Sequence, residues 1–202
     1  PGSRKPTDFW MLTLNQDIQQ FAETFPLAKD LKNSKFLITG ATGLIGSTLV
    51  RCLESLDQNI DIFCPVRNIN KTEARFQELR NTRFVETVLV EYLDSLNESF
   101  DYIIHCASPT AGKYMTEHPV ETYELAIQST NALLRYARNT PIKGMVYISS
   151  LEVYGQILDG KIITEDVMGY LDPSDPRSSY PMGKRAAEFL CTSYAKEYGI
   201  PA

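Results

Sequence analysis

Residues 36–50 read Phe36-Leu37-Ile38-Thr39-Gly40-Ala41-Thr42-Gly43-Leu44-Ile45-Gly46-Ser47-Thr48-Leu49-Val50. The stretch begins as a short apolar run with strand character that ends at Thr39, and glycines follow at positions 40, 43 and 46. An amphipathic helix is expected next, because apolar residues recur at helical spacing from Leu44 to Leu53. A strand, a glycine turn and a helix form the context in which a dinucleotide pyrophosphate binds at a helix N-terminus.

The three glycines have separate expected roles in this turn. Gly40 permits a tight turn, Gly43 lets phosphate oxygens approach the backbone, and Gly46 lets the helix pack closely on the strand. Their G-x-x-G-x-x-G spacing is one residue longer at the front than the commoner G-x-G-x-x-G, and by itself it is weak evidence, since a structural turn can look similar. With the strand before and the helix after, we expect six residues to bind the nucleotide: Gly40, Thr42, Gly43, Leu44, Ile45 and Gly46.

The composition is that of a globular chain and argues against several functions. The 202 residues are 43% hydrophobic, which is enough for one full domain with a sizeable core. The net charge of −5 gives no basic footprint for nucleic acid, and no apolar run approaches the ~18 residues of a membrane span. The four cysteines form no C-x-x-C pair, so we expect free thiols in a reducing cytoplasm.

The two histidines are not expected to form a metal site. His105 ends a predicted buried strand, where we expect it to pack or to bond to backbone. His118 precedes Pro119 at a predicted helix start and is expected to be exposed.

Beyond the turn, strand and helix patterns alternate along the chain. Strands are predicted at residues 35–39, 60–66, 83–90, 102–106 and 144–149, and helices at 44–55, 71–80, 120–139 and 180–198. Such alternation predicts an α/β fold: a doubly wound parallel sheet, Rossmann-like, with strand order 3-2-1-4-5 and the ligand at the carboxyl ends of the strands.

We assign residues 35–202 to this dinucleotide-binding domain, and residues 1–34 to a tag remnant (Pro1-Gly2-Ser3) and an amphipathic helix. That helix is predicted over residues 8–25, where Trp10, Leu14, Ile18, Phe21 and Phe25 recur at helical spacing. A doubly wound dinucleotide fold needs a further strand after helix 180–198. We therefore expect the domain to be truncated before its last strands, with a C-terminal substrate domain absent.

Tyr180 and Lys184 lie four residues apart at the start of a predicted helix, so their side chains share one face. A lysine ammonium beside a phenol lowers the pKa of the phenol, which makes Tyr180 a candidate general base and leaves Lys184 able to reach a ribose hydroxyl. Such a pair on a helix is usually a surface pair. Its place one element after the fifth predicted strand favours the catalytic interpretation.

The tip of the fifth strand supplies two more candidates, Ser150 and Glu152. It lies at the sheet edge where ligands bind in this architecture. Ser150 can hydrogen-bond the hydroxyl that Tyr180 would deprotonate. Glu152 can act as an acid or base at a neighbouring carbon, or is merely a solvated loop acid.

Four motifs together resemble the extended short-chain dehydrogenase/reductase family that acts on nucleotide sugars. They are T-G-A-T-G-L-I-G at 39–46, H-C-A-S at 105–108, S-S-L-E-V-Y-G at 149–155 and Y-P-M-G-K at 180–184. The resemblance runs from Phe36 to Ala202. It implies a catalytic triad of Ser150, Tyr180 and Lys184, with Ala107, Ser108, Tyr180 and Lys184 also at the cofactor. It further implies a homodimer through helices 120–139 and 180–198, although those faces could equally be core.

Within that family the chain looks most similar to the UDP-glucuronate decarboxylases. The similarity lies in H-C-A-S-P at 105–109 with K-Y-M at 113–115, and in T-E-D at 164–166 before D-P-R-S-S-Y-P-M-G-K-R-A-A-E at 175–188. It places Glu152 where decarboxylases and 4,6-dehydratases carry a catalytic glutamate. The dehydratases have an aspartate before that glutamate, and Leu151 here argues against dehydration. Ala126 departs from an asparagine that is usual in the family.

The resemblance implies transient oxidation of a sugar C4 by bound NAD(P), with decarboxylation of a UDP-uronate. Three other interpretations stay open: a nucleotide-sugar 4-epimerase or 4,6-dehydratase, an NADPH-dependent reductase, and a non-catalytic dinucleotide-binding module. For these 202 residues alone we expect cofactor binding with little or no turnover.

The residues after the second strand bear on the choice between NAD and NADP. The strand ends in Val66-Arg67-Asn68, where NAD-dependent relatives place an acid for the ribose 2′-hydroxyl. Arg67 could instead pair with a 2′-phosphate, or be a solvated arginine. We therefore expect Arg67 and Asn68 at the cofactor and leave NAD versus NADP open.

Overall fold

A computed structural model describes residues 6–94, 96, 98–157, 160 and 162–202, without the side chains of residues 6–12 and 94. The expected tag remnant at residues 1–3 and the packing of the Trp10 side chain lie outside these described parts.

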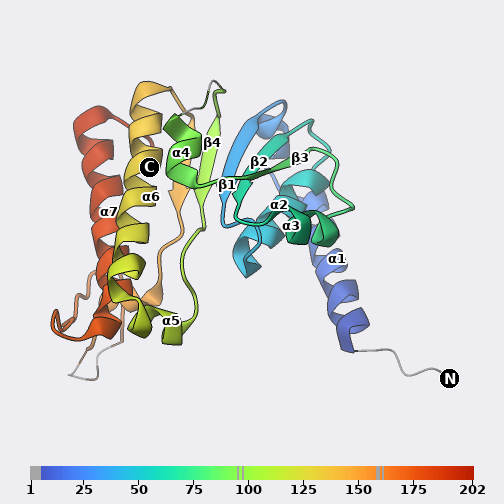
Figure 1. The fold of residues 1–202 in the computed structure, drawn as a ribbon. Coiled ribbons are helices and arrows are strands. Elements are labelled where there is room, and N and C mark those ends of the chain that lie inside the picture. The colour runs from blue at the N-terminus through green and yellow to red at the C-terminus, as the bar shows by residue number, and fades with distance from the viewer. Residues whose placement is uncertain (1–5, 95, 97, 158–159, 161) are drawn as a thin grey trace.

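A five-stranded parallel sheet forms the centre of the fold, in the order β3-β2-β1-β4-β5 (Figure 1). Its strands are β1 (Lys35–Thr39), β2 (Asp61–Val66), β3 (Thr82–Glu86), β4 (Tyr102–His105) and β5 (Gly144–Tyr147). The predicted Rossmann-like α/β fold is therefore confirmed. The strand order reverses between β1 and β4, and this architecture binds ligands beside that reversal, at the carboxyl ends of the strands.

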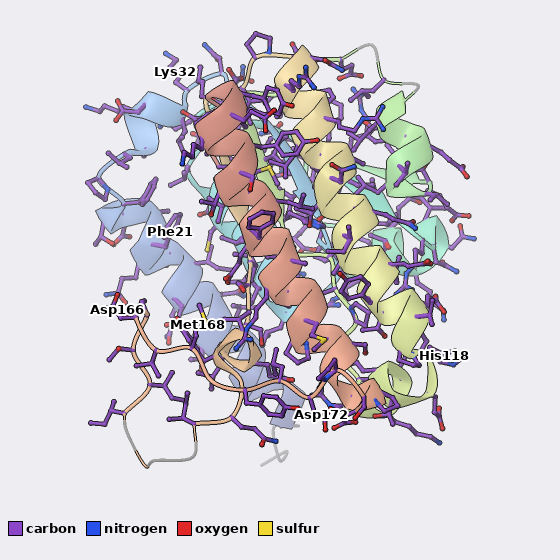
Figure 2. All side chains as sticks on the ribbon, turned by 90° about the vertical axis from the view of Figure 1, so that its left-hand side faces the viewer. Phe21, Lys32, His118, Asp166, Met168 and Asp172 are labelled. Atoms are coloured by element: carbon purple, nitrogen blue, oxygen red, sulfur yellow. The ribbon has the colours of Figure 1, made fainter. Side chains whose placement is uncertain are left out.

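Helices cover both faces of the sheet, as Figure 1 shows. One face carries α1 (Pro6–Thr24), α2 (Leu44–Ser55) and α3 (Ile69–Arg75); the other carries α4 (Leu89–Asp94), α6 (Pro119–Asn139) and α7 (Ser179–Tyr198). Helices α6 and α7 pack side by side across their face, and His118 lies at the start of α6 (Figure 2). The short helix α5 (Gly112–Glu117) and the 3-10 turns η1 (Ala28–Leu31), η2 (Leu151–Tyr154) and η3 (Pro176–Ser178) complete the elements.

The central strands alternate their side chains between two hydrophobic clusters, one on each face of the sheet. Leu37 of β1 belongs to the cluster beneath α6 and α7, whereas Phe36 and Ile38 belong to the cluster beneath α2. Phe21 and Phe25, whose rings stack at 4.8 Å, pack against the second cluster. This contact attaches the N-terminal helix to the outside of the domain, as its periodicity predicts.

Three short elements differ from the sequence-based expectation. Helix α3 spans residues 69–75 instead of 71–80, because the Asn68 side chain accepts the Lys71 N–H at 3.0 Å and caps it, and Phe76 leaves the helix to bury its ring. Strand β3 ends at Glu86 instead of residue 90, since the apolar residues that follow form α4 and pack against the α6 face. Helix α5 is not predicted by the sequence pattern, because six residues are too few to show a helical period.

Gly199 ends α7 in the left-handed conformation (φ +69°), and Pro201 then lies beside the outer strand, where its carbonyl accepts the Met145 N–H at 2.7 Å. The four cysteines are free, as expected. None of the helices in the described ranges is both long and apolar enough to cross a bilayer.

Candidate active site

The glycine turn between β1 and α2 has no room for side chains at two of its glycines. Gly40 has φ +69°, and a Cβ there would lie 2.6 Å from the Ala107 nitrogen in the segment after β4. A Cβ at Gly46 would lie 2.3 Å from the Gly40 carbonyl oxygen. The predicted tight turn is therefore seen, and the close approach at Gly46 is between the helix and the turn residues Gly40 and Ala41.

The turn presents the start of α2 to the sheet edge. Gly43 is the N-cap residue in an extended conformation, and its N–H donates to the Gly40 carbonyl at 3.0 Å. The first N–H groups of a helix have no partner within the helix, so those of Leu44, Ile45 and Gly46 are available to an anion. Leu44 is 85% exposed and Ile45 50% exposed, although both are large and apolar.

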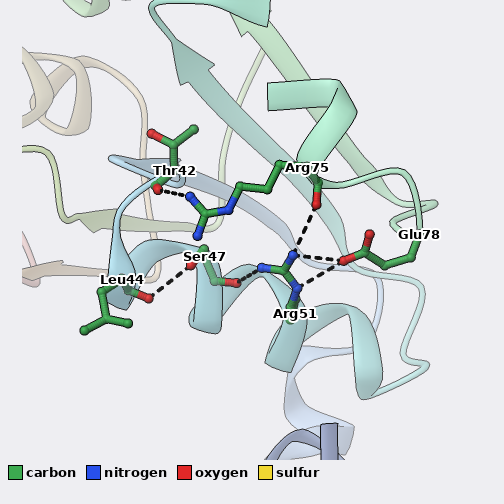
Figure 3. A network of polar contacts seen from close by, with 6 residues as sticks. All are labelled: Thr42, Leu44, Ser47, Arg51, Arg75 and Glu78. Carbon is green, nitrogen blue, oxygen red and sulfur yellow. Dashed lines mark hydrogen bonds and ion pairs between the residues drawn. The ribbon is translucent and has the colours of Figure 1, made fainter. Parts of the chain in front are cut away.

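Two arginines, Arg51 and Arg75, form a network of hydrogen bonds beside this turn, on the side of α3 (Figure 3). Arg75 donates from Nη1 to the Thr42 carbonyl at 2.7 Å. Arg51 pairs with Glu78 at 3.0 Å and also donates to the Ser47 and Arg75 carbonyls. Arg75 thus places an exposed cation directly beside the turn, a contact that the sequence does not predict.

The segment after β2 and the end of β3 meet beside this turn. Arg67 is exposed, and the Asn68 side chain is used as the cap of α3. Glu86 at the end of β3 accepts the Ile69 N–H at 2.6 Å. The end of β2 therefore carries a cation, and the neighbouring carboxylate is held by the backbone of α3.

The segment after β4 is tied to the turn by a directed chain of hydrogen bonds through His105. The Thr39 hydroxyl accepts the Ala107 N–H at 3.2 Å, so its own proton can go to His105 Nδ1, 2.5 Å away. Ser129 donates to the Leu125 carbonyl at 2.5 Å, so its oxygen can accept the His105 Nε2–H at 3.1 Å. This directionality requires the neutral Nε2–H tautomer.

Burial, assisted by the positive charge of Lys184, lowers the pKa of His105 to about 3. The histidine is thus a neutral structural link between β1, β4 and α6. It packs as expected, but its ring bonds to the side chains of Thr39 and Ser129 and not to backbone. Ala107 and Ser108 follow it as half-buried residues, and Ala107 lies directly against Gly40.

Lys184 is buried at the carboxyl end of β5. Its ammonium donates to the Ile148 carbonyl at 2.7 Å and lies 4.6 Å from the centre of the Tyr147 ring. Burial lowers the pKa of Lys184 from 10.5 to about 8, while Cys106 and Glu188 act in the opposite direction. A lysine that is only 3% exposed carries a desolvation cost, which marks it as more than a surface residue.

Tyr180 lies near this lysine, and Ser150 follows two residues after Ile148, whose carbonyl the lysine contacts. The Lys184 ammonium is 5.8 Å from the centre of the Tyr180 ring, so the predicted shared face brings the two together. Ser150 caps η2 by accepting the Glu152 N–H at 3.2 Å, which leaves its hydroxyl proton to donate elsewhere. Both Ser150 and Tyr180 are half-buried.

Glu152 is fixed by a residue that the sequence pattern does not single out. Arg177, in η3, donates from Nη2 to Glu152 Oε1 at 2.8 Å, and its guanidinium lies 5.9 Å from the centre of the Tyr180 ring. Arg177 Nη1 is buried without a partner among the described residues. The Glu152 side chain is thus paired with Arg177 and is also 41% exposed to solvent.

Residues 36–202 match the family described as "NAD dependent epimerase/dehydratase family". The chain is 30% identical to UDP-glucuronic acid decarboxylase 6 of Arabidopsis thaliana, over 87% of the chain and 52% of that protein. It is 28% identical to a probable dTDP-glucose 4,6-dehydratase of Sinorhizobium fredii, over 83% of the chain and 51% of that protein. The chain thus spans about half the length of the curated relatives it matches.

A similar fold is found in the UDP-glucuronic acid 4-epimerase from Bacillus cereus, solved in complex with UDP-glucuronic acid and NAD. The TM-score is 0.65 at 23% identity, covering 83% of this chain and 54% of the epimerase. The family match spans the glycine turn, the β4 and β5 ends and the Tyr180–Lys184 pair together. This chain belongs to the NAD dependent epimerase/dehydratase family.

Proposed function

We propose that the protein containing this chain modifies a nucleotide sugar, by transient oxidation at C4 with bound NAD(P) and decarboxylation of a UDP-uronate. The observation that carries this proposal is the Glu152 carboxylate after β5, which is paired with Arg177, whose guanidinium lies 5.9 Å from the centre of the Tyr180 ring. The curated relatives that the chain matches include UDP-glucuronic acid decarboxylases, which supports the choice of substrate class.

The residues present fit a nicotinamide dinucleotide. Gly40 and Gly46 keep the turn free of side chains, and the start of α2 offers unpaired N–H groups for a pyrophosphate. From this turn, contacts run through Ala107 and His105 to the Ile148–Lys184 pair. The two ends of the site thus share one sheet edge, as a dinucleotide requires.

The cofactor would supply reversible hydride transfer at C4 of the sugar. We assign to Tyr180 the removal of the O4 proton, and to Ser150 the hydrogen bond that orients the same hydroxyl. The Lys184 ammonium stabilises the Tyr180 phenolate electrostatically, and the bond to the Ile148 carbonyl fixes its position.

Glu152 is assigned to the carbon next to the ketone. In a uronate oxidised at C4, the ketone lies β to the carboxylate, so carbon dioxide can leave while its electron pair delocalises into the ketone. A carboxyl group at Glu152 can exchange a proton at that carbon. Leu151 stands where dehydratases carry an aspartate, so dehydration has no corresponding acid.

The test uses the full-length protein with UDP-glucuronate, following carbon dioxide and UDP-xylose. We expect both products, with total cofactor absorbance unchanged after complete turnover. A Tyr180→Phe variant provides the inactive control. Turnover of another nucleotide sugar without release of carbon dioxide would overturn the decarboxylase proposal and leave the family membership intact.

Two alternatives give different readouts. A 4-epimerase needs Ser150, Tyr180 and Lys184 but not Glu152, so Glu152→Gln would scarcely change its rate.

A net NADPH-dependent reductase is favoured by Arg67, the cation at the end of β2. It would consume reduced cofactor in proportion to product, which absorbance measures directly.

We also propose a homodimer formed through α6 and α7. These helices leave apolar side chains in solvent, including Val120 (69% exposed) and Phe189 (70% exposed). Sedimentation of the wild type and of Phe189→Glu tests this, with dimer expected for the first and monomer for the second.

Four free thiols suit a reducing compartment, so we propose a cytoplasmic location. For the 202 residues alone we propose cofactor binding with little or no turnover.

A further inference from the structure

We infer that Tyr147 is a positioning residue of this site: the face of its ring holds the Lys184 ammonium, in its charged form, beside Tyr180. The inference rests on the proposed function, because that function needs a protonated Lys184 to stabilise the Tyr180 phenolate. Tyr147 ends β5, two residues before the motif at 149–155, and the chemistry assigned above does not use it.

The Lys184 ammonium is buried without a close counter-ion. In the part of the chain that the structure describes, no carboxylate lies within ion-pair distance of it. A buried charge loses its hydration, so it stays charged only where other groups compensate. The Ile148 carbonyl accepts one hydrogen bond, which leaves two of the three N–H donors of the ammonium. A further favourable contact within the fold must therefore be of another kind.

The ring of Tyr147 supplies such a contact. Lys184 Nζ lies over this ring, 4.6 Å from its centre, which is inside the ~6 Å within which an aromatic face attracts a cation. The centre of the Tyr180 ring is farther away, at 5.8 Å. Cation–π contacts are strongest where water is excluded, as it is around this buried lysine.

The hydroxyl group of Tyr147 does not supply this stabilisation. Its oxygen is buried and has no hydrogen-bond partner among the described residues. Burial raises the pKa of Tyr147 well above its ordinary value, and Cys191, Tyr180 and Glu188 act in the same direction. The phenol is therefore neutral near pH 7 and is no anionic partner for the lysine. The group that Tyr147 offers to Lys184 is the face of its ring.

The sheet and the core hold Tyr147 in this position. Tyr147 is the register partner of His105 in the pairing of β5 with β4, and the centres of the two rings lie 5.6 Å apart. The Ile148 N–H donates to the His105 carbonyl at 3.0 Å, so the same pairing fixes the segment that accepts the ammonium. The Tyr147 ring also packs against the hydrophobic cluster beneath α6 and α7. Two consecutive residues at the end of β5 thus hold the lysine, one by its ring and one by its carbonyl.

The other ionisable side chains around the Lys184 ammonium are His105, Cys106, Tyr180 and Glu188. His105 is neutral, and burial raises the pKa of Cys106 to about 11, so neither carries a charge near pH 7. Glu188 lies one turn further along α7 and favours the charged lysine from beyond ion-pair distance. Because Glu188 acts in the same direction as the ring, a test of the ring must leave Glu188 unchanged.

The pKa of Lys184 can be measured in the 202-residue chain without turnover. In protein labelled with carbon-13 at lysine Cε, the NMR signal of Lys184 is the one that Lys184→Met removes. We expect a pKa of about 8 in the wild type. Tyr147→Phe keeps the ring and should titrate at the same pH. Tyr147→Leu should titrate about 0.5–1.5 pH units lower, which corresponds to the loss of one buried cation–π contact.

Ring-fluorinated phenylalanine at position 147 tests the ring at nearly constant shape, and it serves equally where Tyr147→Leu does not fold. Fluorine withdraws electron density from the face of the ring, so the pKa of Lys184 should fall stepwise as fluorines are added. Tyr170→Leu, which removes an exposed tyrosine from the loop before α7, is the matched control and should leave the titration unchanged. Thermal melts establish that each variant is folded.

The full-length protein gives the corresponding readout in the reaction. In Tyr147→Leu the alkaline limb of carbon dioxide release from UDP-glucuronate should move to lower pH by the same amount. The rate on that limb should then fall about three- to thirtyfold at a given pH. Tyr147→Phe should keep the wild-type position of the limb. A loss of packing alone would lower the rate equally at every pH.

An unchanged pKa of Lys184 across the fluorinated series would overturn the inference and leave the proposed function standing. This holds even where Tyr147→Leu shifts the pKa, because packing and not the ring face would then hold the lysine. An equal shift in Tyr147→Phe and Tyr147→Leu would also overturn the inference, since the hydroxyl group would then be the partner. If the full-length wild type released no carbon dioxide while Lys184 titrated as expected, the proposed function would fail and the role of the ring in holding the charged lysine would stand.

Discussion

Arg177 Nη2 lies 2.8 Å from Glu152 Oε1, while the same guanidinium lies 5.9 Å from the centre of the Tyr180 ring. The pair joins η2 to η3, and η3 leads directly into α7. Their side chains are 38% and 41% exposed, so the ion pair itself contributes only about 0–1 kcal/mol to stability. Its main consequence is positional, because it ties the Glu152 carboxylate to an arginine that lies near the candidate base.

Replacing Glu152 by Gln tests whether that carboxylate takes part in the chemistry. We expect carbon dioxide release from UDP-glucuronate by the full-length protein to fall by about 10²–10⁴-fold, the usual range for a general acid or base. The free energy of unfolding should change by no more than about 1 kcal/mol, since the group is part-exposed.

Glu117→Gln is the matched control, because Glu117 is an exposed carboxylate in a surface pair with Lys113. It should retain full activity. Retention of the wild-type rate of carbon dioxide release by Glu152→Gln, with the protein folded, would remove Glu152 from the mechanism.

His105 should make the stability of the chain depend on pH. Its pKa is about 3 in the folded state and about 6.5 when unfolded, so between these values only the unfolded state takes up the proton. Acid therefore favours unfolding, and this group should cost about 2 kcal/mol between pH 7 and pH 5. Urea denaturation at the two pH values measures the loss.

Two variants isolate the contribution of His105. His105→Gln should be less stable at pH 7, because it disrupts the bonds to Thr39 and Ser129, but it should lose about 2 kcal/mol less on acidification. The exposed second histidine supplies the control, since His118→Gln should keep the wild-type pH dependence. Equal pH dependence in all three proteins would contradict a buried neutral His105.

Lys184→Met should show that the buried ammonium lowers stability near neutral pH. Folding depresses the pKa of Lys184 from 10.5 to about 8, so above pH 8 the folded state releases a proton that the unfolded state keeps. The wild type should therefore gain about 2 kcal/mol from this group between pH 7 and pH 9.5. The variant should lack that gain, although it should also lose activity.

Denaturation curves of both proteins at the two pH values give the difference directly. Lys196→Met, at an exposed position near the end of α7, is the control and should follow the wild type. If Lys184→Met gained as much stability as the wild type on alkalisation, the ammonium would not be buried in the folded state.

Local patterns predict most of the fold, because each long element shows its own period. Strand β1 and helix α2 have the predicted bounds, and the strand order follows from alternation and crossover handedness. The prediction of strand at the start of α4 is wrong, since residues 88–90 are apolar and too few to distinguish the two periods. Packing against α6 stabilises the helical conformation of α4, and this is a tertiary effect.

The candidate site likewise contains contacts that the sequence predicts and contacts that it does not. Tyr180 and Lys184 share a helix, so spacing alone predicts their proximity. Arg177 and Glu152 are separated by 25 positions and meet only through the path of the intervening loop. The link from Thr39 to His105 depends on the pairing of β1 with β4, in which these two residues are register partners. The sequence alone therefore does not pair Arg177 with Glu152, because the pairing depends on the structure of the loop between them.

Gly46 and Gly112 offer a test of why the opening turn requires glycine. A methyl group at Gly46 would lie 2.3 Å from the Gly40 carbonyl oxygen, so α2 would have to move away from the turn. Gly46→Ala should therefore destabilise the fold by about 1–3 kcal/mol or more and abolish dinucleotide binding, because the helix N–H groups move with it. A Cβ at Gly112 would have no described atom within 4 Å, so Gly112→Ala should bind the cofactor normally and unfold at the same urea concentration or higher. Calorimetric binding and urea denaturation of the two variants check both parts. Normal binding by Gly46→Ala would show that the turn does not set the pyrophosphate position, since no backbone arrangement with this close approach accommodates the methyl group.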